Sequence, residues 1–112
     1  MTQGVREEVV DAKNHFEREF GYLTSNFYIM KACLRYFSVK KGMSFTSSKV
    51  SDNFPISIPV AGSSLKVLDE LDIVDSRGSK PERYMPQNVD LEKMDEVEEI
   101  LLESKEIRDF KG

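Results

Sequence analysis

The sequence has little of what catalytic and metal-binding sites are usually made from. Its 112 residues include one cysteine, Cys33, one histidine, His15, and no tryptophan. A single cysteine excludes an internal disulfide, and a single histidine argues against a metal site built on imidazoles. The sequence also contains no glycine-rich phosphate loop, no nucleophile elbow and no histidine-rich metal motif. We therefore expect that the chain is not an enzyme, and that it uses no cofactor and no metal.

Long apolar runs are missing as well. No stretch of 18 apolar residues occurs, so we expect no membrane span and no membrane partner. The first eight residues lack the basic end and the apolar run of a signal peptide. Because a lone cysteine also fits a reducing compartment, we expect a cytoplasmic protein. Hydrophobic residues make up 39% of the chain, which is enough for one core, and we predict a single domain over residues 1–112.

An excess of positive charge is the third absence, since the formal net charge is −4. Proteins that bind nucleic acids normally present many lysines and arginines to phosphates. The negative charge is concentrated after residue 88, where nine acidic residues accompany four basic ones, while residues 40–88 carry seven basic and six acidic residues. Most cations of this middle part lie at Lys40, Lys41, Lys49, Arg77, Lys80 and Arg83. The acidity weakens a DNA-binding hypothesis without excluding it.

Apolar spacing predicts a mainly helical chain. Intervals of three and four residues predict a helix over Val5–Phe20, with Gly21 as its C-terminal cap, and a second helix from about Thr24 to Lys40. A short helix is expected over residues 47–54, capped by Thr46 or Ser47 and stopped by a proline. After a turn at residues 56–58, a further helix should begin near Pro59 and bury Leu65, Leu68 and Leu71. A long charged helix is expected over residues 89–110.

Short extended segments separate these helices. Residues 43–46 alternate and predict an edge strand or an extended segment, and residues 73–76 and 82–85 predict a β-hairpin around a Gly- and Pro-containing turn. The predicted order is helix, helix, short strand, helix, turn, helix, hairpin, helix. Two short helices joined by a turn of three or four residues form a helix-turn-helix unit.

The stretch Ser64–Arg77 resembles the segment that joins the recognition helix to the wing in winged helix regulators of the ArsR and MarR types. It has a serine pair, a leucine stripe, a short turn and an Ile-Val strand, and Arg83-Tyr84 matches the basic end of the wing. The resemblance covers about residues 25–86, and it implies a winged helix-turn-helix fold with extra N- and C-terminal helices. The family commonly has a glycine where this chain has Asp72. Metal sensing by paired cysteines is not expected here.

The resemblance implies that the protein is a sequence-specific, double-stranded DNA-binding transcriptional regulator. The N-terminal part of a recognition helix enters the major groove, and the residues placed there or on its approach are Ser57, Gly62, Ser63, Ser64 and Lys66. Contacts to phosphates from the wing and from helix ends are expected from Lys40, Lys41, Ser47, Lys49, Arg77, Lys80 and Arg83. For Ser63 and Ser64 the alternative interpretation is a cap or a solvated surface, and for Ser47 simple helix capping explains the serine equally well.

The flanking helices, residues 5–20 and 89–110, are interpreted as dimerisation elements, because a palindromic DNA site needs two copies of the reader. The expected interface residues are Val9, Phe16, Leu91, Met94, Val97 and Leu101. Two other interpretations of the last helix remain open: it covers its own domain, or it binds another protein. The alternative function is a winged-helix module for protein–protein interaction in a transcription or replication assembly.

Two smaller features complete the prediction. Cys33 lies among apolar residues and is expected in the core. An aromatic band is expected in the core or in a dimer seam, although it is also compatible with a pocket for a small-molecule effector; its residues are Tyr22, Phe27, Tyr28, Tyr36 and Phe37.

Overall fold

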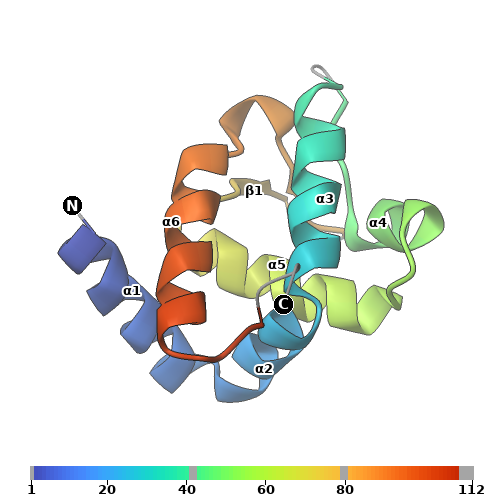
Figure 1. The fold of residues 1–112 in the computed structure, drawn as a ribbon. Coiled ribbons are helices and arrows are strands. Elements are labelled where there is room, and N and C mark those ends of the chain that lie inside the picture. Colours follow the sequence, from blue (N-terminus) through green and yellow to red (C-terminus); the bar gives the residue numbers. More distant parts are fainter. Residues whose placement is uncertain (1, 41–42, 79–80, 109–112) are drawn as a thin grey trace.

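The computed structural model describes residues 2–40, 43–78 and 81–108, which fold into a mainly helical body with one small antiparallel sheet (Figure 1). In chain order the elements are α1 (Thr2–His15), α2 (Glu17–Ser25), α3 (Phe27–Ser38), α4 (Ser47–Asn53), α5 (Ile58–Glu70), β1 (Ser76–Arg77), β2 (Arg83–Tyr84), the 3-10 helix η1 (Pro86–Asn88) and α6 (Leu91–Glu103). None of the helices in the described ranges is long and apolar enough to cross a bilayer.

The first predicted helix is two helices. The chain leaves helical geometry at Phe16, with φ −128° and ψ 54°, and α2 then runs past Gly21, which is therefore not a C-terminal cap. The break lets the half-buried Phe16 side chain pack against the core that Phe20 and Leu23 enter from the new helix. An exposed glycine costs a helix about 1 kcal/mol relative to alanine, and burial of these two apolar neighbours outweighs it.

Helix α3 confirms the second predicted helix. It begins after Asn26, whose side chain does not cap it but donates to the Tyr22 carbonyl at 2.9 Å. It ends at Ser38, slightly before the predicted boundary. One face is buried along its whole length, through Phe27, Met30, Cys33, Leu34 and Phe37.

Helices α4 and α5 form the predicted pair, and their caps explain their limits. The Thr46 hydroxyl accepts a hydrogen bond from the Lys49 amide at 3.2 Å, and the Ser57 hydroxyl accepts one from the Val60 amide at 3.4 Å. Each cap satisfies an amide that has no partner within its helix. Pro59 occupies the first turn of α5, where a missing N–H costs nothing. The two helices pack against each other, and α2 lies along another side of α5.

The hairpin is shorter than predicted. β1 pairs with β2 in the register Ser76 with Tyr84 and Arg77 with Arg83. The expected strand over 73–76 begins three residues late, because Asp72 adopts a left-handed φ of 59° and the next two amides turn back to the Leu68 carbonyl.

An extended residue joins the hairpin from far along the chain. Phe45 forms an isolated antiparallel bridge with Tyr84, and each backbone N–H donates to the other's carbonyl, at 3.0 and 2.8 Å. Tyr84 therefore lies between β1 and the segment that precedes α4. This confirms the extended segment expected over residues 43–46, although only Phe45 is bridged.

The last helix, α6, ends at Glu103 rather than near residue 110, and Phe110 lies outside the described residues. Lys105 adopts a left-handed φ of 60° and turns the chain back toward the core, where Ile107 is buried. Helix α6 lies beside α1 and α3 of the same chain (Figure 1). Its apolar face is buried there through Met94, Val97, Ile100 and Leu101.

This packing corrects the expected dimer interface. Val9, Met94, Val97 and Leu101 are at most 3% exposed within one chain, and Phe16 and Leu91 are half-buried. Side chains that are already buried gain nothing from a second copy. Three ion pairs instead tie α1 to the C-terminal part of its own chain: Arg6–Glu103 at 2.6 Å, Lys13–Glu106 at 2.8 Å and Glu8–Lys93 at 2.7 Å.

Candidate nucleic-acid interface

Helix α5, the expected recognition helix, presents only a narrow stripe to solvent. Ala61, Leu65, Val67 and Leu68 are buried between its neighbours α2 and α4. The exposed positions are Ile58, Pro59, Lys66 and Glu70, with Gly62 and Ser63 half-exposed. A side chain must reach a groove edge to read a base. Ser63 and Lys66 are therefore the polar or basic side chains of this stripe that are suited to the task.

Ser64 does not belong to such an interface. Its side chain is fully buried, and its hydroxyl donates to the Val60 carbonyl one turn earlier at 2.8 Å. The sequence contained a signal for this, because Ser64 falls three residues after Ala61 and four before Leu68, on the face that packs inward. The expectation that Ser64 contacts DNA is wrong.

Three other residues predicted to contact DNA from α5 or its approach already make contacts within the protein. The exposed Ser57 uses its hydroxyl as the cap of α5. Gly62 brings α5 close to α4, since a Cβ at this position would lie 3.8 Å from the side chain of Ser47. Lys66 places its ammonium 5.1 Å from the centre of the Phe16 ring. A cation over an aromatic face is attracted to it but keeps its charge.

Replacing Ser64 by alanine should leave binding to duplex DNA unchanged. The change removes one intrahelical hydrogen bond and adds a better helix former, so stability should move by less than about 1 kcal/mol. Ser63→Ala is the matched control, because its half-exposed hydroxyl lies on the solvent stripe. Anisotropy titrations of a labelled duplex measure both, and a weaker Ser64→Ala complex would return this residue to the interface.

The hairpin places two arginines directly opposite each other, Arg77 on β1 and Arg83 on β2, and both are exposed. Like charges in such a pair repel. Arg77 is partly neutralised, because its Nε and Nη2 donate to Asp75 Oδ2 at 3.2 and 2.9 Å, and the Asn88 amide donates to the same oxygen at 2.9 Å. The hydrogen bond from Arg77 lowers the pKa of the Asp75 carboxyl.

Arg83 differs from its neighbour in the strand pair. It has no ion pair with any residue of the described ranges. Lys80, which was expected beside it in the turn, lies outside the described residues, as does Lys41. The Asp75 clamp on Arg77 was missed from the sequence. Its signal was the spacing of two residues, which puts both side chains on one face of a strand.

The remaining predicted cations lie at the junction of α3 and α4. Lys40 and Lys49 line one small cleft there, together with Tyr36 and Asn53. Lys40 Nζ lies 4.6 Å from the centre of the Tyr36 ring. Ser47 is half-buried at the contact between α4 and α5, which fits packing rather than DNA contact.

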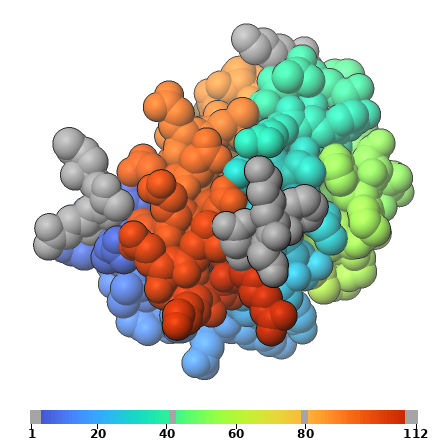
Figure 2. Space-filling model, viewed as in Figure 1, coloured from blue at the N-terminus to red at the C-terminus, as the bar shows by residue number. Residues whose placement is uncertain are grey.

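The face formed by α3 and α6, which is turned toward the viewer in Figure 2, is rich in acidic side chains. An open groove of about 480 Å³ there is lined by Lys31 and Arg35 and by four acidic side chains of α6, Asp95, Glu96, Glu98 and Glu99. Lys31 Nζ donates a hydrogen bond to Glu98 and lies 3.3 Å from Asp95, and the hydrogen bond to Glu98 raises the pKa of Lys31. Phosphates would be repelled from this face.

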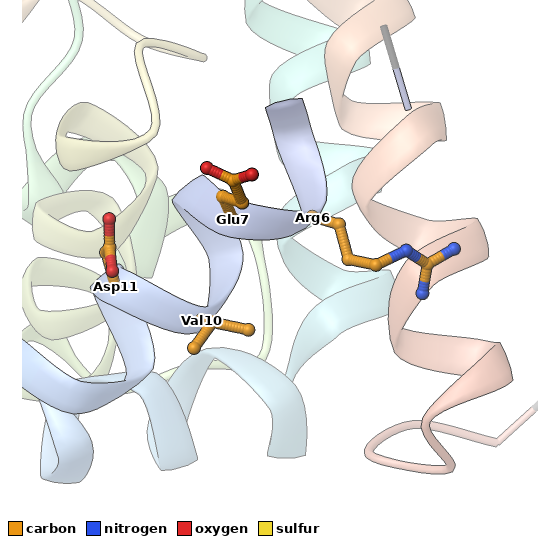
Figure 3. A pocket seen from close by; sticks show the side chains of 4 residues that line it. All are labelled: Arg6, Glu7, Val10 and Asp11. Carbon is orange, nitrogen blue, oxygen red and sulfur yellow. The ribbon is translucent and has the colours of Figure 1, made fainter. Parts of the chain in front are cut away.

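A further depression lies on α1 and has no convergent chemistry. Its lining residues are Arg6, Glu7, Val10 and Asp11, all from one helix. In Figure 3 Arg6 extends toward α6 and away from Glu7 and Asp11, in keeping with its ion pair to Glu103.

The aromatic band does not form one effector pocket in the described part of the chain. Phe27 and Tyr28 line one cleft beside Ile107, while Tyr36 and Phe37 line the cleft at α4. Phe27 and Phe37 are themselves buried in the core.

Cys33 is fully buried, and burial raises the pKa of its thiol to about 12. His15 is exposed at the end of α1. Within the described residues, no three His, Cys, Asp or Glu side chains are grouped so that they could hold a metal ion.

Comparison with protein-family models, with curated proteins and with solved structures finds no match for this chain. The functional argument therefore depends on topology and charge.

Proposed function

We propose that this chain is a winged-helix domain that binds double-stranded DNA as a regulator, and that its affinity comes mainly from backbone phosphates. The observation that carries the proposal is the bridge from Phe45 to Tyr84. This bridge joins the extended segment before α4 to the hairpin that follows α5. The chain from α3 to β2 then forms one unit, in which the helix pair α4 and α5 is followed by a hairpin, and a third extended segment pairs with that hairpin. A hairpin placed directly after a helix-turn-helix is the arrangement of a wing.

The charge distribution supports phosphate contact at the hairpin. Arg83 is exposed and has no described acidic partner, and it lies opposite Thr46 across the bridge, beside the start of α4. Contacts to phosphates fix a protein on a duplex but carry no sequence information. Base reading would fall to Ser63 and Lys66. Sequence specificity thus rests on few side chains in this proposal.

A homodimer on a palindromic site remains part of the proposal only with a different interface. Of the six residues first expected there, four are buried in one chain and two, Phe16 and Leu91, are half-buried. A two-fold pair would have to use exposed surface, such as the outer side of α1 around Val10.

The second candidate is a protein-interaction module. Three of the exposed large apolar side chains, Tyr36, Val39 and Met43, lie within eight positions around the end of α3. An exposed apolar patch of this kind is typical of a surface that binds another protein. The burial of most of α5 also favours this candidate.

Replacing Arg83 by alanine should weaken binding to a random-sequence duplex roughly fivefold at low salt, because one phosphate contact is lost. The slope of log affinity against log salt should become shallower by about 1. Arg77→Ala should have a smaller effect, because Asp75 already neutralises part of that charge. Fluorescence anisotropy at two salt concentrations measures both quantities.

Arg18→Ala is the matched control for charge, since Arg18 is exposed on α2 and its nearest acidic partner is Glu19 at 3.8 Å. It should leave affinity unchanged. Wild-type protein that shows no salt-sensitive binding would overturn the DNA proposal and favour the interaction module.

A further inference from the structure

We infer that the cleft between α3 and α4 is a binding site for a single phosphate group, held between the ammonium groups of Lys40 and Lys49. The cleft has a volume of about 130 Å³ and is formed by the end of α3, the extended residues 43 and 44, and α4. Its polar lining comprises Tyr36, Lys40, Ser44, Lys49 and Asn53.

Charge is the first argument. Two lysines line the cleft, and its lining includes no carboxylate among the described residues. Neither lysine lies within ion-pair distance of an acidic side chain in the described ranges. Lys13, Lys31 and Lys93, in contrast, each contact a glutamate. Two cations that share one cleft repel each other, and an anion between them reverses the sign of the interaction.

Positioning is the second argument. Lys40 is held over the Tyr36 ring at 4.6 Å. That ring is fixed in turn by edge-on contacts with Phe37 at 5.0 Å and Phe54 at 5.6 Å. A side chain that is already positioned loses less conformational entropy when it binds. The half-buried Ser44 hydroxyl makes no side-chain hydrogen bond within the described residues, so its proton is available to an oxyanion.

Size is the third argument. At about 30 Å³ per water molecule, the cleft holds roughly four waters, which is the scale of one tetrahedral oxyanion. Pockets for larger organic ligands begin at about 300 Å³. A phosphate group fits this volume and the two positive charges, whether it is carried by a duplex backbone or by a small molecule. The first source rests on the proposed function, and the second does not.

The test uses inorganic phosphate against chloride at constant ionic strength, followed by two-dimensional NMR of the whole chain. Amide signals of Ser44, Lys49 and Asn53 should shift and saturate with phosphate. Lys49→Gln should weaken this binding at least fivefold, while Lys49→Arg, which keeps the charge, should retain it. Lys105→Gln is the control, since it removes an exposed lysine beyond α6. Shifts that never saturate, or that Lys49→Gln leaves unchanged, overturn the site.

A second arm identifies the source. Lys49→Gln should also weaken binding to a random duplex roughly fivefold. Loss of phosphate binding without an effect on duplex binding assigns the site to a small phosphorylated ligand. Phosphate binding by a protein that ignores DNA keeps the site and removes the proposed function. Duplex binding without any phosphate response keeps that function and removes the site.

Discussion

Replacement of Phe45 by alanine is expected to destabilise the protein by about 3–5 kcal/mol. Its ring is fully buried, stacks on Phe37 with ring centres 4.7 Å apart, and lies 5.7 Å from Tyr84. Small domains have a total stability of about 5–15 kcal/mol, so the loss is a large share of it. The change also removes the side chain that holds the extended segment against the hairpin.

Urea unfolding followed by circular dichroism measures this loss. Val39→Ala is the control, since Val39 is 77% exposed and should change stability by less than about 0.5 kcal/mol. Hydrogen exchange at the Tyr84 amide, which donates to Phe45, should accelerate in the Phe45 variant. An unchanged midpoint would mean that the ring does not anchor the hairpin.

The protein is also expected to lose stability steeply above pH 9. Burial raises the pKa of Cys33 from 9.0 to about 12, and burial likewise raises the pKa of Tyr84 to about 12. The folded chain keeps these protons at pH values where the unfolded chain releases them. Stability is therefore fully present below pH 9 and falls as pH rises, by about 1.4 kcal/mol for each pH unit through Cys33 alone. The raised pKa of Lys31 acts in the same direction above pH 10.5.

The cysteine dominates the interval from pH 9 to 10, because the pKa of its thiol in the unfolded chain is near 9.0, whereas the ordinary pKa values of Tyr84 and Lys31, 10.0 and 10.5, lie at or above the upper end of the interval. Urea midpoints of wild type and Cys33→Ala, taken at pH 7, 9 and 10, test the prediction. The variant should be less stable at pH 7 but should change little between pH 9 and 10. Parallel curves for the two proteins would show that the thiol does not carry the effect.

Much of the helical pattern was predictable because its causes are local. Thr46 and Ser57 cap α4 and α5 through their own hydroxyls, and Pro59 occupies the first turn of α5. The buried leucines of α5 follow from spacing alone. For the same reason the burial of Ser64 was open to prediction.

The failures come from contacts distant in sequence. The helix break at Phe16 serves packing against residues of the core, and no breaker residue marks it. Hairpin length depends on Asp72, an aspartate in a conformation that favours glycine. The apolar stripe of α6 correctly predicted a buried face, but its partner, α1 of the same chain, is more than 70 residues away. Periodicity shows that a face is buried and not what covers it.

The position of α6 makes the distribution of charge over the molecule uneven. Helix α6, which is rich in acidic residues, lies on one side of α3, and α4 lies on the other side (Figure 1). Such a body has an electric dipole moment, and the field of a polyanion exerts a torque on it. A nearby duplex would rotate the molecule so that α6 faces away from the DNA before any contact formed. The net charge of −4 opposes the approach of the protein to DNA. The uneven distribution of the charge sets the orientation in which the protein reaches the duplex.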